Sequence, residues 1–306
     1  MSSSRREFMQ AVIAGAVGSS FTLRGFAQAP PPPITATKLT PDLVLLAGAG
    51  GNIALVIGPD GLLMIDSGLV ERSADLLKSV ADIDGHKVTT LFNTHWHFDH
   101  VGSNEALGRM GAKIVAHENT KAHLGVRTAM EVANRTFDPL KPEGMPVETF
   151  TRGGTIAFAK QRLEYTHVPL AHTDGDAYVF FPSLNVLHTG DLLFNGTFPV
   201  IDYSNGGWIG GMAQAAAALG KVGDANTRII PGHGPLATKD DLKATYTMLA
   251  TIQERIEPMI KAGKTVEEAV AAHPTREFDD KFGQGVRKPD AFVQVAYTSI
   301  QRRAKK

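Results

Sequence analysis

Three histidines and one aspartate occupy positions 95–100 of this 306-residue chain, in the order His-Trp-His-Phe-Asp-His. Neutral imidazole nitrogens and a carboxylate oxygen are the donors that zinc and similar borderline metals accept. An isolated histidine is more often a surface or core residue, and a polar loop without any ligand is the alternative. Four such residues so close together nevertheless favour a metal site.

Three more polar clusters contain the same residue types. They read Ala-His-Thr-Asp-Gly-Asp at 171–176, Thr-Gly-Asp at 189–191 and Pro-Gly-His-Gly at 231–234. Each one alone is better explained as turn chemistry, because glycine and aspartate are common turn residues. Together with positions 95–100 they supply seven candidate ligands. That number is what two metals sharing a bridging group need.

The composition narrows the kinds of ligand. The chain has 31 basic and 31 acidic residues, so its formal net charge is zero and nucleic acid has no electrostatic support as a partner. The absence of cysteine excludes disulfides, thiolate nucleophiles and cysteine metal sites. With 43% apolar residues, the chain can bury one large or two small cores. A small-molecule substrate fits best, and the oligomeric state stays open.

The elements that position the clusters form an alternating pattern of strands and helices. The first half predicts strands at 43–46, 53–57, 62–65, 88–92 and 113–116, with helices at 70–83 and about 103–111. The strand at 88–92 delivers the histidine-rich loop at its carboxyl end, where layered α/β folds commonly carry function. Residues 118–136 are interpreted as a surface helix, followed by a mobile flap at 139–146.

The second half repeats this style. Strands are predicted at 155–158, 163–168, 178–181, 186–188 and 228–230, and helices at 210–219, 240–260, 266–272 and 290–302. The three later polar clusters each follow one of these strands. The pattern predicts an α/β fold in which loops after strands gather the candidate ligands.

The four motifs, in this order and spacing from about residue 43 to residue 233, resemble the metallo-β-lactamase superfamily. The resemblance implies a four-layer αβ/βα sandwich with metals at one edge, between the two sheets. It assigns the ligands as follows: His95, His97 and His172 to the first metal, Asp99, His100 and His233 to the second, and Asp191 as the bridge. Asp66 matches the aspartate that supports the ligand loop from behind.

The chemistry of the residues agrees with this division. Side chains two positions apart in extended backbone point the same way, so His95 and His97 can face one ion. Asp99 and His100 would turn toward the second, neighbouring metal ion. Two zinc ions are the predicted cofactors, with iron and manganese as alternatives. A hydroxide bridging the two ions would be the nucleophile, oriented by Asp99.

The predicted function is therefore a dinuclear zinc hydrolase that opens a carbonyl bond in a lactam, lactone, ester or thioester, with β-lactams among the candidate substrates. Two alternatives stay open: a mononuclear iron oxidoreductase of the same fold, and a non-catalytic, exported metal-binding accessory protein. Specialised β-lactamases of the superfamily have cysteine where Asp191 stands and lysine at the position of Phe194, which disfavours that branch. The helical tail after residue 239 resembles an exported, cyclase-like or lactamase-like branch.

Four aromatic residues follow Asp191 in a glycine-broken loop and are candidates for the substrate-binding mouth: Phe194, Phe198, Tyr203 and Trp208. The alternative is that they close the core beneath the loop.

The N-terminus resembles an export signal. Residues 4–9 read Ser-Arg-Arg-Glu-Phe-Met, like a bacterial twin-arginine signal, and the apolar stretch 11–21 that follows is too short for a stable membrane span. A small-x-small cleavage pattern lies at 27–29. We predict a signal peptide at 1–29, a single domain with a helical C-terminal extension at 30–306, and a periplasmic or secreted location. A frayed or membrane-anchored N-terminus is the alternative.

Overall fold

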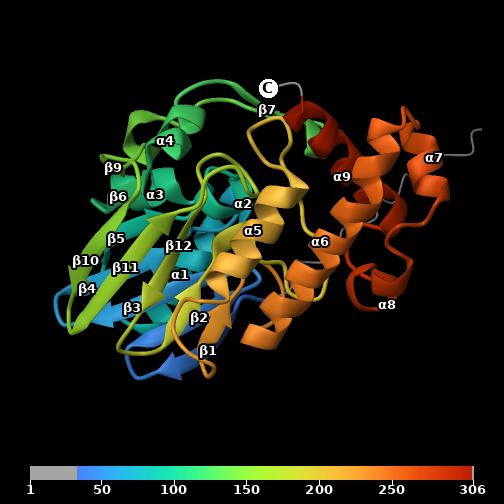
Figure 1. Cartoon of the computed structure of the whole chain (residues 1–306). Coiled ribbons are helices and arrows are strands. Elements are labelled where there is room, and N and C mark those ends of the chain that lie inside the picture. Colours follow the sequence, from blue (N-terminus) through green and yellow to red (C-terminus); the bar gives the residue numbers. More distant parts are fainter. Residues whose placement is uncertain (1–32, 305–306) are drawn as a thin grey trace, which may run out of the picture. The chain divides into compact units, whose positions relative to one another are not determined.

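The computed structural model describes residues 33–304, which belong to one compact unit built on two large β-sheets (Figure 1). The predicted export signal at 1–29 lies outside the described residues. Among the helices of residues 33–304, none combines the length and the apolar composition needed to cross a membrane.

The first sheet has seven strands in the order β1-β2-β3-β4-β5-β6-β9. Their bounds are β1 (Thr35–Thr40), β2 (Leu43–Ala47), β3 (Ile53–Gly58), β4 (Gly61–Ile65), β5 (Val88–Asn93), β6 (Lys113–His117) and β9 (Glu148–Phe150). The first four pair antiparallel and the remainder parallel. The crossovers carry α1 (Ser73–Ile83) and α3 (Asn104–Arg109). Strand β1 was not predicted, because this largely exposed edge strand lacks an apolar run.

The second sheet has five strands, β10 (Gly153–Phe158), β11 (Gln161–His167), β12 (Ala177–Phe181), β13 (Val186–His188) and β14 (Arg228–Ile230). All pairs are antiparallel except β13 and β14, which are parallel. The chain reaches β14 through α5 (Ile209–Leu219), as a parallel connection requires. The C-terminal part adds α6 (Lys239–Lys261), α7 (Val266–Ala271), α8 (Asp279–Phe282) and α9 (Pro289–Arg303).

The alternation of strand residues explains the layers. Leu43 and Leu45 of β2 belong to the core between the two sheets, which also contains Val179 and Phe181 of β12. Their neighbours in β2 point the other way and pack, with Leu76 of α1, in a second core. Successive strand side chains face opposite sides of a sheet, so a strand apolar on both faces lies between two layers.

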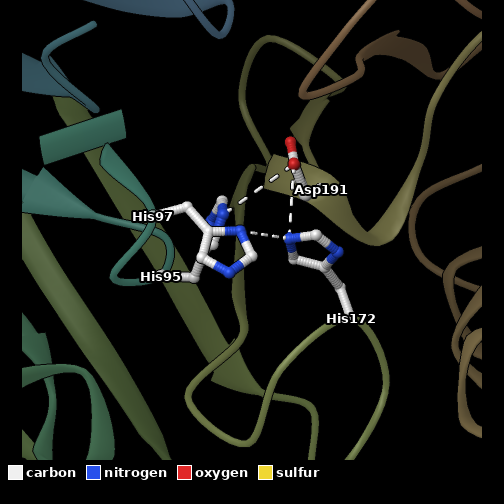
Figure 2. A group of neighbouring side chains, drawn as sticks. All are labelled: His95, His97, His172 and Asp191. Atoms are coloured by element: carbon white, nitrogen blue, oxygen red, sulfur yellow. Dashed lines mark hydrogen bonds and ion pairs between the residues drawn. The ribbon is translucent and has the colours of Figure 1, made fainter. Parts of the chain in front are cut away.

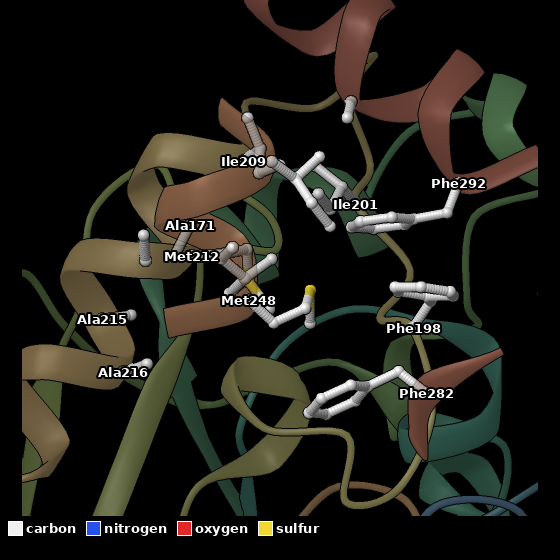
Figure 3. Close-up of a cluster of buried hydrophobic side chains, with 14 of the residues drawn as sticks. Ala171, Phe198, Ile201, Ile209, Met212, Ala215, Ala216, Met248, Phe282 and Phe292 are labelled. Carbon is white, nitrogen blue, oxygen red and sulfur yellow. The ribbon is translucent and has the colours of Figure 1, made fainter. Parts of the chain in front are cut away.

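A third core covers the outer face of the second sheet with residues of α5, α6 and α9 (Figures 1 and 3). Met212 of α5 and Met248 of α6 are fully buried in it. The layers are thus helices, sheet, sheet and helices. The predicted four-layer αβ/βα sandwich is confirmed.

The prediction of one surface helix at 118–136 is wrong beyond its first turns. Helix α4 (Glu118–Leu124) is followed by a hairpin of β7 (Thr128–Met130) and β8 (Arg135–Phe137). Asn134 adopts φ of 50° at the turn, a left-handed conformation that asparagine tolerates. The Phe137 ring stacks on Phe98, with centroids 5.0 Å apart, so a tertiary contact rather than local periodicity holds the hairpin.

Candidate metal centre

Four loops converge at one end of the two sheets, each following a strand that ends there: β5, β11, β13 and β14. The first loop runs into the short helix α2 (Phe98–Val101), and the third contains the 3-10 turn Gly190–Leu192. The structure brings together all seven predicted ligands in two groups, and within each group the ligand atoms lie within 4.8 Å of one another. The first group is His95, His97, His172 and Asp191, and the second is Asp99, His100 and His233.

The first group is buried around one oxygen of Asp191 (Figure 2). Asp191 Oδ2 lies 3.3 Å from His172 Nε2 and 3.8 Å from His95 Nε2. His172 Nε2 is in turn 2.8 Å from His97 Nδ1. The donor atoms of three loops therefore point into one small volume.

The second group surrounds the other oxygen of the same carboxylate. Asp191 Oδ1 lies 3.1 Å from His100 Nε2 and 3.4 Å from His233 Nε2. His233 Nε2 is also 3.1 Å from Asp99 Oδ2. Asp191 thus faces both groups, one oxygen to each, which is the arrangement a bridging ligand needs.

The ring orientations of His97 and His172 are fixed from outside. His97 Nε2 donates to Asp202 Oδ2 at 3.1 Å, and His172 Nδ1 donates to the Val200 carbonyl at 2.8 Å. In the neutral rings the lone pairs are then on His97 Nδ1 and His172 Nε2, the two atoms that face each other. Sequence reasoning missed Asp202, whose only signal was its position in a polar turn, where Ser204 also donates to it.

Asp66 supports the ligand loop, as its match to the family motif implied. It has φ of 65° and accepts hydrogen bonds from the backbone N–H and the hydroxyl of Thr94, both at 2.8 Å, and from His100 Nδ1 at 2.7 Å. Because the Thr94 hydroxyl donates to Asp66, it accepts from His95 Nδ1, 3.0 Å away. Both histidines therefore present Nε2 toward the centre.

The donor set fits metal ions. His95 Nε2 and Asp191 Oδ1 are buried without a hydrogen-bond partner among the described residues, and the contact of Asp191 with His100 lacks hydrogen-bond geometry. The lone pairs of His97 Nδ1 and His172 Nε2 face each other, and these two atoms are 2.8 Å apart. Buried acceptors that converge in this way repel one another unless a cation lies between them.

The two groups differ in their electrostatics. Burial and the neighbouring His97 lower the pKa of His172 to about 4, and burial also holds the pKa of His95 well below its usual range. In the second group, burial acts in the same direction on His233, but the charge of Asp191 outweighs it and raises the pKa to about 9. Burial raises the pKa of Asp99, yet His100 and His233 lower it to about 2. The second group therefore attracts positive charge more strongly.

Two glycines permit the close approach of backbone to ligands. A Cβ at Gly232 would lie 2.0 Å from Asp191 Oδ1, and one at Gly51 would lie 2.2 Å from His100 Cε1. Asn52, which sequence reasoning did not single out, holds the His233 loop with hydrogen bonds from Nδ2 to the carbonyls of Pro231 and Gly234, both at 2.9 Å. The turn after β2 thus shapes the centre without supplying a ligand.

The four predicted substrate-binding aromatic residues separate into two places. Phe194 stacks on His233 with centroids 5.0 Å apart, and it lines a cavity of about 500 Å³ with Asp99 and Asp191. Phe198 reaches the same cavity but is buried and stacks on Phe292 at 4.6 Å, so it is mainly a core residue (Figure 3).

Tyr203 and Trp208 lie elsewhere, in a separate hollow of about 240 Å³ with Arg302 and Arg303. The expectation that these two residues line the mouth with Phe194 does not hold. The reason is that the chain turns away at Asp202, whose carboxylate is engaged by His97 and by the following turn.

Comparisons with known proteins agree with the fold and the motifs. The profile described as metallo-beta-lactamase superfamily matches residues 47–258. A hydroxyacylglutathione hydrolase of Maricaulis maris is 30% identical over 122 residues, 40% of this chain and 40% of that protein's length. A type 2 metallo-beta-lactamase of Bacteroides fragilis is 23% identical over 198 residues, 64% of each chain. The solved structure of a metallo-beta-lactamase from Pontibacter korlensis covers 71% of this chain and 99% of its own, with a TM-score of 0.58 and 23% identity.

Proposed function

The chain belongs to the metallo-beta-lactamase superfamily, as its motifs predicted, and we propose that it is a two-zinc hydrolase that opens a carbonyl bond of a small molecule. The observation that carries the proposal is the position of Asp191. One oxygen of Asp191 faces the three histidines of the first group, and the other oxygen faces the second group, which consists of Asp99, His100 and His233. A buried carboxylate placed between two such groups suits a pair of cations better than a single one.

Zinc suits the donors that the described residues provide. Five imidazole nitrogens and two carboxylates face the centre. Imidazole binds zinc well, whereas magnesium and calcium prefer oxygen ligands. In the first group His95 and His172 are neutral at pH 7, because burial lowers the pKa of each, so their lone pairs are available. Iron and manganese remain alternatives that metal analysis separates from zinc.

Bound zinc ions would supply the electrophile that polarises a carbonyl and the acidified water that attacks it. The protein's own residues do the positioning. Asp99 lines the cavity and, with a pKa of about 2, is a carboxylate at neutral pH that can accept a hydrogen bond from water. Such a weak base orients the nucleophile better than it removes a proton. Thr94, Asp66 and Asp202 keep the ligand rings in place.

The cavity favours substrates with an apolar acyl group or ring. Its walls include Phe98, Met130, Phe194 and Val200, and its volume of about 500 Å³ is within the range of small-molecule sites. Two relatives are named hydroxyacylglutathione hydrolase and metallo-beta-lactamase type 2. An acylglutathione is a thioester, so these names support thioesters and lactams as the first classes to assay.

The test is a hydrolysis panel with zinc-loaded protein and lactams, lactones, esters and thioesters. We expect turnover of at least one class, and we expect Asp99→Ala to reduce kcat by roughly 100-fold or more. Asp138→Ala is the matched control, since that side chain is 83% exposed. No turnover of any class would contradict the proposal, and so would a single iron per chain with oxygen uptake.

We further propose export by the twin-arginine route, on the strength of residues 4–9 and the apolar stretch 11–21. Replacing both arginines, Arg5→Lys with Arg6→Lys, should keep the protein in the cytoplasm of a bacterial host. Unchanged delivery to the periplasm would contradict this route.

A further inference from the structure

An arginine from the C-terminal part of the chain reaches the cavity of the metal centre. Arg287 lies between α8 and α9 and lines the cavity together with Asp99, Asp191 and His233. It is outside residues 47–258, the stretch that matches the superfamily profile. Arg287 therefore reaches the centre from a segment that the superfamily profile does not cover.

The guanidinium of Arg287 makes no hydrogen bond and no ion pair with any residue of 33–304. Its Nε is buried without a hydrogen bond, and no carboxylate of residues 33–304 lies within ion-pair distance of it. The two carboxylates that line the same cavity are already engaged, since Asp99 contacts His233 and Asp191 faces the two ligand groups. A buried donor and a partly buried charge without a partner are costly in a folded protein, so this arrangement calls for an explanation.

A second donor without a partner lines the same cavity. Thr197 Oγ1 is buried and makes no hydrogen bond among the described residues. The loop that carries it packs against the segment of Arg287, because a Cβ on Gly285 would lie 1.9 Å from Thr197 Oγ1. Two segments far apart in the sequence thus bring to one cavity two residues that each carry an unsatisfied donor.

We infer that Arg287 and Thr197 form a subsite for a carboxylate group of the substrate in the cavity beside the metal centre. This inference rests on the proposed function and narrows it to amides, lactams or thioesters that also carry a carboxylate. A planar carboxylate matches the fork of a guanidinium and brings one negative charge for one positive charge. A phosphate would bring more charge and more oxygens than these two donors satisfy.

The test uses two thioesters that differ only in the group for the subsite. S-phenylacetyl mercaptoacetic acid carries the carboxylate, and S-phenylacetyl mercaptoacetamide replaces it with a neutral amide of similar shape. Thiol release by zinc-loaded protein gives kcat/KM for each. Arg287→Met removes the charge, Arg287→Lys keeps it without the fork, and Thr197→Val removes the hydroxyl. Arg276→Met is the control, since Arg276 is exposed in the same part of the chain and does not line the cavity.

We expect Arg287→Met to lower kcat/KM for the acid about 10- to 100-fold, mainly through KM, and to change the value for the amide less than about twofold. Arg287→Lys and Thr197→Val should show smaller losses of the same selectivity, and Arg276→Met should show none. Equal losses for acid and amide would overturn the subsite, as would no loss for either.

A failure of the proposed function is distinguishable from a failure of the subsite. If the wild-type protein cleaves neither thioester, binding of hippurate and of hippuramide is measured by calorimetry instead. The subsite predicts that hippurate binds more tightly and that Arg287→Met removes this preference, whereas a preference that survives the substitution overturns it. The midpoint of thermal unfolding should not fall in Arg287→Met, because the variant loses no hydrogen bond and no ion pair among residues 33–304.

Discussion

Replacing Asp202 with asparagine tests how the chain prepares His97 to bind metal. Asp202 is fully buried, and its Oδ2 accepts the Nε2–H of His97 at 3.1 Å. Burial raises the pKa of Asp202, but the hydrogen bond and charge of His97 lower it to about 2. The carboxylate is therefore charged at neutral pH and keeps the proton of His97 on Nε2, so Nδ1 is free for metal.

The size of the effect follows from the tautomer. In Asp202→Asn, an amide N–H facing His97 favours a proton on Nδ1, the atom needed as a ligand. Loss of such an outer partner typically weakens metal affinity about 10- to 100-fold. Asn keeps an oxygen that can accept from Ser204 Oγ, which lies 2.5 Å from Asp202 Oδ1, so the fold should survive.

The assay is competitive zinc titration with a chromogenic chelator, with Asp224→Asn as the matched control. Asp224 also accepts hydrogen bonds in a turn, from Asn185 and Asn226, but it lies outside both ligand groups. We expect weaker binding of one zinc ion in Asp202→Asn and unchanged binding of both ions in Asp224→Asn. Unchanged affinity for both ions, with an intact fold, would refute the role of Asp202.

Two further predictions concern the ligand groups. Acidification from pH 8 to pH 6 should release the zinc of the second group first. Protons compete with zinc for His233, because Asp191 raises the pKa of His233 to about 9, whereas His172, with a pKa of about 4, stays neutral. Metal content after dialysis at each pH measures the order of release, and simultaneous release of both ions would speak against this prediction. Gly232→Ala should lower zinc content to one ion or fewer with little change in fold, since its Cβ would lie 2.0 Å from Asp191 Oδ1, and full metal loading by elemental analysis would contradict this.

The sequence predicted the ligand loops well because their chemistry is local. Metal ligands at positions 95–100 stand in one short segment, and each of His172, Asp191 and His233 directly follows a strand whose apolar pattern is easy to recognise. Strand periodicity predicted the strands themselves, and residues such as Leu43 and Val44 fill cores on opposite faces of one strand. The four-layer arrangement followed from the resemblance of the motifs to the superfamily.

What the sequence could not predict depends on contacts between distant segments. Asp202 and Arg287 have no local pattern, and only the fold brings them to the centre, beside His97 and into the cavity respectively. The prediction of a helix fails at the hairpin of β7 and β8, because the stacking of Phe137 on Phe98 outweighs a weak local preference for helix. These two residues are 39 positions apart in the chain. Residue types alone did not separate Phe194 from Tyr203.

The central claim is a pair of metal ions bridged by Asp191, and counting metal per chain tests it most directly. Elemental analysis of purified, zinc-loaded protein should give two zinc ions per chain, and Asp191→Asn should give no more than one, because one carboxylate faces both ligand groups. A single metal in the wild-type protein, or two tightly held ions in Asp191→Asn, would contradict the account.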